Sequence, residues 1–245
     1  MKGRSASKIK LTSYDELLGG GEETNDIQQV SLEHLHSFEN HPFQVNDDEA
    51  MAELVESVKE EGILTALLVR PLGDGEYEII AGHRRRHAAQ LAGLKEVPVI
   101  IRNMDQDTAV RAMVDSNLQR PNILPSEKAF AYKMKLDAMK RQGQRRDLTS
   151  VPLAQKFKGK TSREILGEQV GESQDQIRRY IRLTDLIPEI LEMVDDKKIS
   201  MRPAVELSYL PKEEQEILYD TMESEDCTPS HAQAIKIRKF QQRAD

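Results

Sequence analysis

β-prone segments are concentrated in the first half of this 245-residue chain and nearly disappear after Pro121 and Pro125. Apolar runs at 63–70, 76–81 and 97–102 have the length and composition of strands, and the glycines of PLGDG between the first two favour a reversing connection. A chain of this length exceeds a typical single core of about 100 to 200 residues. The sequence therefore predicts an α+β N-terminal domain followed by an all-α domain.

Helical spacing of apolar residues predicts helices that begin near Asn46, 84, 107 and 126, the first of them ending at Gly62. The opening residues combine a basic start with GGGEETND, a composition that buries too little apolar surface to hold one conformation. We expect a flexible tail at 1–26, the α+β domain at 27–120, the all-α domain at 121–225 with a basic connector near 142–160, and a C-terminal tail or short helix at 226–245.

The charge distribution bears on the kind of partner. The net charge of −7 by itself argues against a polyphosphate partner, which must be neutralised by Lys and Arg. Residues 121–185 nevertheless carry 14 basic and 8 acidic side chains, a local charge of +6, whereas 1–120 and 186–245 are acidic, at −8 and −5. Cationic charge is therefore concentrated in one segment, as nucleic-acid binding requires.

The segment 162–183, SREILGEQVGESQDQIRRYIRL, has the spacing of a helix-turn-helix. Gly171 falls where two short helical stretches meet, because a left-handed turn there disfavours a residue with a Cβ. Ser173 can cap the second helix, and small Gly167 falls where the helices cross most closely. Four residues are expected to pack between the helices: Leu166, Val170, Ile177 and Tyr180.

The second helix of this motif would present polar and cationic side chains that hydrogen-bond base edges or phosphates. The candidate DNA-binding residues are Arg163, Ser173, Gln174, Gln176, Arg178, Arg179 and Arg182. On the motif alone, an ordinary helical hairpin with a solvated charged face fits equally well, because the pattern is short. The surrounding basic segment favours double-stranded DNA.

Two further segments place cationic and amide side chains beside expected helix ends: AGHRRRHA at 81–88 and SNLQR at 116–120. Gly82 follows a strand and opens a helix, a junction at which backbone N–H groups can approach a phosphate. Arg84, Arg85 and Arg86 can add charge-assisted bonds to it. A solvated face with one or two surface ion pairs is the commoner explanation of such a run, so these segments alone do not decide.

Across residues 27–225 the sequence resembles the ParB partition family, including its KorB-like regulators. The resemblance is carried in order by DDEAMAELVESVKEEGILTALLVRP, GEYEIIAGHRRRHAAQLAGLKEVPVIIR, SNLQRPNILPSEKAFAY and the helix-turn-helix. The first arginine-rich segment is similar to the family's phosphate box, G-E-R-R-x-R-A, and the second to its E-N-x-Q-R box.

The resemblance implies a ParB/sulfiredoxin-like front domain that binds CTP with magnesium and clamps a homodimer on a palindromic, centromere-like DNA site. It implies that Asn117 ligates magnesium. It further implies a ParA-type ATPase as partner, met by a basic tail such as MKGRSASKIK, for which a merely solubilising role fits equally well. The implied nucleotide-binding residues are Gly82, His83, Arg84, Arg85, Asn117, Gln119 and Arg120.

Three positions depart from the family pattern. His83 replaces the glutamate of the first box, His87 its last arginine, and Ser116 the glutamate of the second. A carboxylate beside Asn117 would be a hard oxygen ligand of the kind magnesium prefers, and in the family this glutamate is tied to hydrolysis. Slow CTP hydrolysis is therefore an open question, whereas nucleotide binding is only weakened.

Two classes of function compete. The first is DNA segregation of a plasmid or chromosome, with a KorB-like or nucleoid-occlusion-like regulator as the alternative. The second is an enzyme of the sulfiredoxin type, which needs a cysteine beside its phosphate site, whereas the only cysteine, Cys227, lies far away in sequence. With no apolar run near the ~20 residues of a membrane span, we expect a cytoplasmic protein associated with the nucleoid or a plasmid and no membrane contact.

Overall fold

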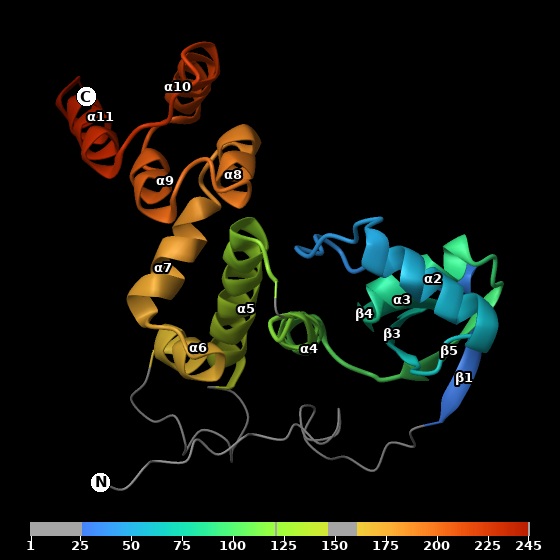
Figure 1. Cartoon of the computed structure of the whole chain (residues 1–245). Coiled ribbons are helices and arrows are strands. Elements are labelled where there is room, and N and C mark those ends of the chain that lie inside the picture. The colour runs from blue at the N-terminus through green and yellow to red at the C-terminus, as the bar shows by residue number, and fades with distance from the viewer. Residues whose placement is uncertain (1–25, 121, 147–160, 245) are drawn as a thin grey trace, which may run out of the picture. The chain divides into compact units, whose positions relative to one another are not determined.

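The computed structural model describes residues 26–120, 122–146 and 161–244, which fall into two compact units (Figure 1). The first unit runs to His36 and resumes from Asp48 to Met104, and the second combines Ser37–Asp47 with the chain from Asp105 onward. Nearly all of the expected tail at 1–26 and most of the expected connector at 142–160 lie outside the described residues.

The first unit is built on a five-stranded mixed sheet. Its strands are β1 (Ile27–Ser31), β2 (Leu35–His36), β3 (Leu67–Gly73), β4 (Glu76–Ala81) and β5 (Glu96–Ile101), and a 3-10 turn, η1 (Leu32–His34), links the first two. The strand order is β1-β5-β3-β4-β2. The β1–β5 and β3–β4 pairs are antiparallel, and the β3–β5 and β2–β4 pairs are parallel. The α+β prediction for this part of the chain is confirmed.

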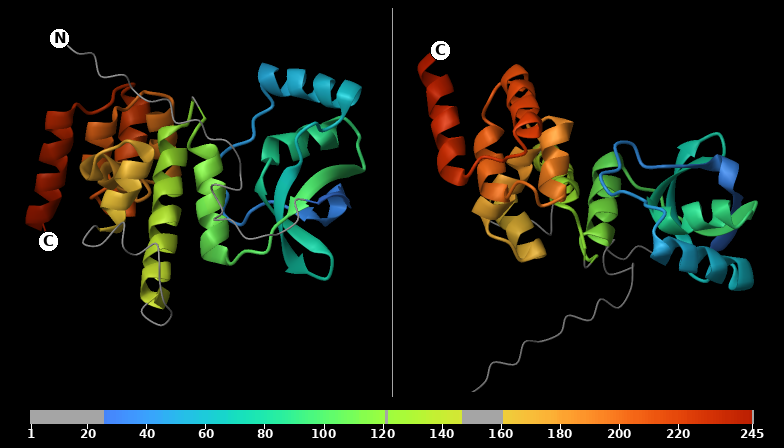
Figure 2. Two further views of the ribbon diagram at one scale, coloured as in Figure 1. Left: turned by 90° about the horizontal axis from the view of Figure 1, so that it is seen from below. Right: turned by 45° about the horizontal axis from the view of Figure 1, so that its top comes forward.

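Helices α2 (Glu49–Glu61) and α3 (His83–Leu91) pack against each other, and α3 packs against β3 (Figure 2). Helix α2 begins at Asp48, whose side chain accepts a hydrogen bond from the Met51 N–H, and it ends at Gly62, which has a φ of 71°. Its apolar residues at helical spacing, Met51, Val55 and Val58, are buried. The amphipathic pattern thus determines which face of α2 is covered.

The expected strand at 63–70 lies later in the structure, because β3 starts only at Leu67 and continues to Gly73. The carbonyl oxygens of Thr65 and Ala66 accept hydrogen bonds from the Arg85 side chain, so this stretch is held by a side chain and not by a neighbouring strand. β-propensity does not reveal such a side-chain bond, which explains the shift.

The second unit is entirely helical in its described regular structure, as predicted. Its helices are α4 (Gln106–Asn117), α5 (Pro125–Arg146), α6 (Ser162–Val170), α7 (Gln174–Leu183), α8 (Pro188–Asp195), α9 (Met201–Leu207), α10 (Lys212–Ser224) and α11 (His231–Ala244). Helix α4 packs against α5. The chain contacts therefore divide after Met104, before the domain boundary expected at 120, because α4 belongs with the helices.

Buried apolar residues of α7 to α11, together with Ala129 of α5, form one core, and the polar residue Gln215 is also buried. The Gln215 side chain is fully buried and satisfied: its amide donates to the carbonyl oxygens of Asp185 and Leu210, and its oxygen accepts from the Ile187 N–H at 2.9 Å. These bonds fix α10 against the turn that follows α7. Nothing in the sequence pattern singled out this glutamine.

The C-terminal segment expected as a tail or short helix contains α11, which packs against α9 and buries Ala234. Arg238 of α11 forms an ion pair with Glu206 of α9 at 2.9 Å, and its guanidinium lies 3.8 Å from the centroid of the Tyr209 ring. Helix α11 is therefore a fixed part of the helical unit. None of the helices in the described ranges combines the length and apolar character that a bilayer span requires.

Candidate nucleic-acid interface and phosphate cradle

Helices α6 and α7 form the expected helix-turn-helix. Thr161 and Glu164 form a capping box at the start of α6, and Gly171 ends the helix in a left-handed conformation with a φ of 73°. The Ser173 side chain accepts a hydrogen bond from the Gln176 N–H at 3.2 Å and so caps α7. The roles of Gly171 and Ser173 were predicted from the sequence, whereas the capping box of Thr161 and Glu164 was not.

The two helices approach closely at Gly167. A Cβ added there would lie 2.6 Å from the carbonyl oxygen of Glu172, a distance that real Cβ atoms do not adopt. Leu166 and Ile177 are fully buried between the helices and pack against Tyr132 of α5. The packing core predicted for this motif is thus present, and α5 packs against it as a third helix.

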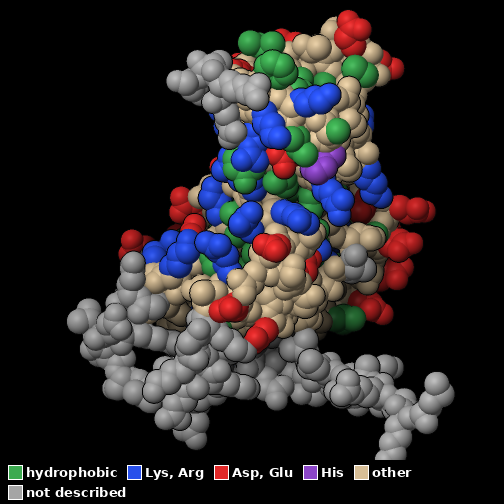
Figure 3. All heavy atoms as spheres, turned by 90° about the vertical axis from the view of Figure 1, so that its left-hand side faces the viewer, with side chains coloured by type: hydrophobic (Ala, Val, Ile, Leu, Met, Phe, Trp, Pro, Cys, Tyr) green, Lys and Arg blue, Asp and Glu red, His purple; other side chains and the backbone are tan. Residues whose placement is uncertain are grey.

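The outward face of the motif carries most of the candidate DNA-binding residues. Arg163, Ser173, Gln174, Arg178 and Arg179 are exposed. Within the described part of the chain, no hydrogen bond or ion pair engages the side chains of Arg178 and Arg179. Figure 3 shows Lys and Arg side chains gathered on the face of the helical unit that carries α6 and α7. Such a face can neutralise phosphates.

Two of the candidate residues are engaged within the fold. The Arg182 guanidinium donates to the Ser208 hydroxyl and carbonyl oxygens at 3.1 and 2.7 Å and lies 4.0 Å from the centroid of the Tyr209 ring. It also pairs with Asp185 at 2.7 Å. Gln176 is half-buried, with its amide 3.5 Å from the sulfur of Met201. Arg182 thus fastens the end of α7 to α9 and is not presented outward like Arg178.

A half-buried polar cluster behind the motif was not predicted from the sequence. The Lys128 ammonium of α5 lies 3.1 Å from a carboxylate oxygen of Glu172 in the turn and 5.2 Å from the Tyr180 ring centroid. Tyr132 meets Tyr180 edge-on at 5.6 Å. Burial, followed by the negative charge of Glu172, raises the pKa of the Tyr132 hydroxyl far above its usual value. The cluster joins α5 to α7, and nothing in the sequence pattern pairs Lys128 with Glu172, because the two residues are 44 positions apart.

In the first unit, Gly82 connects β4 to α3 and has a φ of 111°, as the expected phosphate-binding junction requires. A Cβ at this position would lie 2.8 Å from the side chain of Leu67. His83 opens the helix and is buried. The positive φ of residue 82 and its close packing against Leu67 therefore restrict this position to glycine, and α3 begins directly after it.

The three arginines of α3 reach three different segments. Arg84 lies 3.4 Å from a carboxylate oxygen of Asp48, the cap of α2. Arg85 donates to the carbonyl oxygens of Thr65 and Ala66, at 2.8 Å for the latter. Arg86 donates to the carbonyl oxygen of Leu35 at 3.4 Å. Of the two arginines that the family resemblance assigns to the nucleotide, Arg84 has the weaker internal contact, because Arg85 is held by main-chain acceptors.

The second box lies at the end of α4, in the helical unit. Asn117 is buried, and its amide nitrogen donates to the Met113 carbonyl oxygen at 2.8 Å, an acceptor shared with the Ser116 hydroxyl. Gln119 is exposed, and Arg120 lies 5.7 Å from the ring centroid of Phe43. The two boxes thus belong to separate units, and each box has its own local geometry.

The donors available for magnesium at this box are oxygen atoms. With its nitrogen turned to Met113, Asn117 leaves its amide oxygen as a possible ligand, which suits an ion that prefers oxygen and keeps several waters. No group of three or more His, Cys, Asp or Glu side chains within the described ranges is placed to hold a metal ion. The residues therefore fit a magnesium ion shared with a nucleotide better than one held by protein alone.

Two family models match the chain: ParB N-terminal domain over residues 19–118 and ParB HTH domain over residues 148–237. The probable chromosome 1-partitioning protein ParB of Deinococcus radiodurans is 31% identical over 226 residues, which are 92% of this chain and 71% of that protein. A nucleoid occlusion protein of Listeria monocytogenes is 31% identical over 214 residues, 87% of this chain and 68% of that protein. The chain spans between 52% and 71% of the length of the first curated relatives.

C-terminally truncated ParB from Caulobacter crescentus is a similar solved structure, known in two complexes. Complexed to the centromeric parS site, it has a TM-score of 0.46 and 24% identity and covers 87% of this chain and 99% of that one. Complexed with CTP-gamma-S, it has a TM-score of 0.36 and 26% identity and covers 80% of this chain and 98% of that one.

Proposed function

The chain belongs to the ParB family, and on that premise we propose that it is a site-specific DNA-binding protein of plasmid or chromosome segregation whose hold on DNA responds to CTP. The observation that carries the DNA half is the exposed pair Arg178 and Arg179 on a capped recognition helix. Their guanidinium groups can bind phosphates or guanine without first giving up a partner in the described part of the chain.

The DNA proposal is tested with the double variant Arg178→Ala/Arg179→Ala. We expect weaker binding to a palindromic site and a salt dependence that is shallower by about two units of slope, one for each lost phosphate contact. Fluorescence anisotropy over a salt series measures both quantities. An unchanged affinity together with an unchanged slope would show that α7 is not the helix that contacts DNA.

For the nucleotide half, we propose that the junction at Gly82 receives the triphosphate of CTP. The first N–H groups of α3 follow Gly82 and can donate to phosphate oxygens, and Arg84 can exchange its 3.4 Å contact with Asp48 for a phosphate. His83, Arg85, Gln119 and Arg120 remain candidates by family resemblance alone. Calorimetry with CTP and ATP is the direct test, and equal weak heats for both would contradict a CTP switch.

Magnesium would be bound through the amide oxygen of Asn117 together with nucleotide oxygens and water. When bound, the ion neutralises phosphate charge. Ser116 supplies a hydroxyl where the family has a carboxylate, so we propose CTP binding with slow turnover or none. Asn117→Ala should weaken CTP binding in magnesium, and it should have a smaller effect when the magnesium is replaced by EDTA.

A regulatory role is the second candidate, because the Listeria relative, of which the chain covers 68%, is named a nucleoid occlusion protein. A KorB-like regulator would use the same parts. We propose a cytoplasmic protein associated with the nucleoid or a plasmid, acting as a homodimer on DNA with a ParA-type ATPase as partner. The basic residues proposed to meet that ATPase lie outside the described residues. Mapping of the bound sites by chromatin immunoprecipitation distinguishes one centromere-like cluster from scattered promoters.

A further inference from the structure

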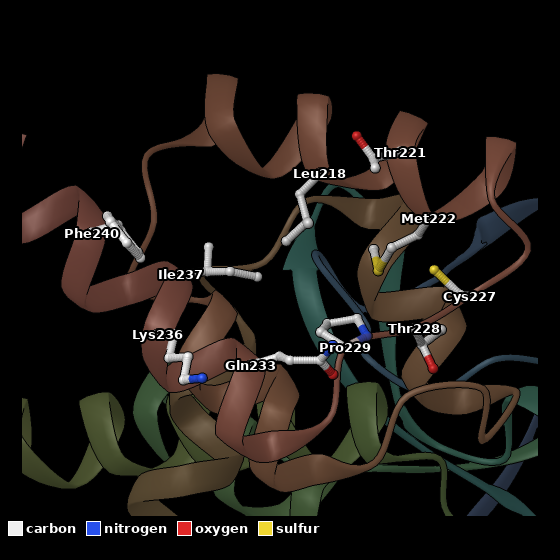
Figure 4. Close-up of a pocket in the computed structure, with 10 residues that line it drawn as sticks. All are labelled: Leu218, Thr221, Met222, Cys227, Thr228, Pro229, Gln233, Lys236, Ile237 and Phe240. Atoms are coloured by element: carbon white, nitrogen blue, oxygen red, sulfur yellow. The ribbon is translucent and has the colours of Figure 1, made fainter.

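An apolar groove lies between α10 and α11, on elements that the proposed DNA and nucleotide sites do not use (Figure 4). Its volume is about 340 Å³, and its walls are mainly apolar. Leu218 and Met222 line it from α10, and Ile237 and Phe240 line it from α11. In Figure 4 the side chains of Leu218 and Ile237 point toward one another across the opening.

Both helices also expose a large apolar side chain. Phe240 of α11, which lines the groove, is 73% exposed, and Ile217 of α10, the neighbour of the lining residue Leu218, is 66% exposed. Exposed apolar residues that occur singly need no explanation, but two of them at one apolar groove are typical of an interaction surface. The patch therefore has the composition of a docking site.

The charges on the two helices are opposite. Helix α10 has one lysine and five acidic residues, whereas α11 has four basic residues and no acidic one. Ile217 lies between Glu213 and Asp220, four residues before and three after it, which share its side of the helix. Phe240 lies one turn after Lys236 and directly follows Lys239 in the chain. Each exposed apolar residue thus has charges of one sign around it.

We propose that this groove is a self-association surface, in which a second copy of the chain lays its α11 across α10 of the first. Phe240 of each copy would enter the groove of the other beside Ile217, and Lys236 and Lys239 would face Glu213 and Asp220. A two-fold axis makes both halves of such an interface identical, because the same chain carries both the acidic and the basic helix. The charges then select the partner and its orientation.

The surface is already formed in the single chain. Arg238 points to the other side of α11, where it pairs with Glu206 and stacks on Tyr209, so α11 is fixed by contacts that leave Phe240 outside. Met222 is buried where it lines the groove, and Pro229, between the two helices in sequence, lines it as well. A rigid surface loses little conformational entropy on association, which favours binding through a small contact area.

The proposal rests on the proposed function only in that a palindromic site recruits two copies. It is tested without DNA or nucleotide, by sedimentation of the full chain over a range of concentrations. We expect a shift from the 27.9 kDa monomer toward twice that mass, and a dissociation constant at least about tenfold higher for Phe240→Ser. A chain that stays monomeric at the highest concentration overturns the proposal.

A charge exchange tests the pairing itself. The double variant Lys236→Glu/Lys239→Glu and the double variant Glu213→Lys/Asp220→Lys should each remain monomeric, because like charges then meet across the interface. Mixed together, they should form a heterodimer, since acidic α11 then meets basic α10 and the reverse pair is native. Absence of the heterodimer contradicts the pairing, and a partner other than this chain would leave both variants and their mixture indistinguishable from wild type.

Two controls separate this surface from the rest of the protein. Lys133→Glu/Lys140→Glu changes the charge by the same amount on α5 and should dimerise like wild type. Binding of Phe240→Ser to a half-site duplex, which needs only one copy, should equal that of wild type. If the wild type does not bind the half-site duplex, the proposed DNA function is refuted while the sedimentation result still tests self-association. Failure of one proposal is therefore distinguishable from failure of the other.

Discussion

The ammonium group of Lys128 lies 3.1 Å from the carboxylate of Glu172, so that α5 is joined to the turn that precedes the recognition helix. Both side chains are largely buried, at 26% and 19% exposure. The pair also sits beside Tyr132 and Tyr180, so it is the polar part of an otherwise aromatic contact. The orientation of α7 therefore depends on a residue well outside the helix-turn-helix.

Replacing Lys128 by Met should lower the free energy of unfolding by about 1–3 kcal/mol, because Glu172 is left as a largely buried charge without its cation. Urea titration measures the change. Adding Glu172→Gln should recover part of the loss, and Lys140→Met, which removes a 55% exposed lysine from the same helix, should have little effect. If the double variant loses the sum of the two single losses, the two side chains do not act as a pair.

Substitution of Arg182 should mainly affect stability, whereas substitution of Arg178 and Arg179 should mainly affect DNA binding. Arg182→Ala should reduce stability by roughly 1–2 kcal/mol, since it removes the bonds to Ser208 and the stacking on Tyr209. The slope of DNA affinity against salt should stay near the wild-type value. Arg178→Ala/Arg179→Ala should do the opposite, with stability within about 0.5 kcal/mol of wild type. A salt slope lowered by Arg182→Ala would place that arginine on the DNA.

Gly82→Ala should disturb the proposed phosphate site at the junction of β4 and α3. An alanine there would be strained by the positive φ, and its Cβ would collide with Leu67. We expect a stability loss of about 1–3 kcal/mol and CTP binding weakened by about tenfold or more. Gly93→Ala is the matched control, because Gly93 also has a positive φ, of 79°, but a Cβ there meets nothing within 4 Å. Equal CTP affinities for the two variants would argue against phosphate approach at residue 82.

His41 predicts a pH dependence of stability. Burial lowers the pKa of the His41 imidazole below its usual value of 6.5, and the positive charge of Arg120 contributes a smaller lowering. Because the unfolded chain then binds a proton more readily, the stabilisation is present above pH 6.5 and is lost as the pH falls through the lowered pKa. Urea titrations at about pH 8 and about pH 5 should show a smaller loss for His41→Asn than for wild type. Parallel losses in both proteins would exclude His41 as the cause.

The local features of the helix-turn-helix were predictable because each depends on a residue type with one dominant physical reason. Gly171 has a positive φ, Ser173 caps a helix, and Gly167 allows a close approach. In the first unit, the sequence pattern predicted α2, α3, β4 and β5, whereas β1 and β2 were not predicted and β3 begins later than expected. Such signals act over a few residues, so a single sequence reveals them.

Features that depend on contacts between distant residues were not predictable. The Lys128–Glu172 pair spans 44 residues, and Arg182 reaches Ser208 across 26. The sequence placed Arg182 on the outer face by helical spacing alone, which cannot tell a solvated guanidinium from one that fastens a neighbouring helix. The sequence also did not predict that α4 belongs to the helical unit, because this depends on the packing of α4 against α5 and not on the order of elements in the chain.

The bonds from Arg85 to the carbonyl oxygens before β3 also limit how a ligand can recruit this residue. A phosphate that draws the guanidinium away leaves two main-chain acceptors to be rehydrated, so part of its binding energy is spent on loosening residues 65 and 66. Amide hydrogen exchange around the start of β3 would then rise when ligand binds. Faster exchange at the start of β3 would therefore report that a ligand occupies the phosphate site at Gly82.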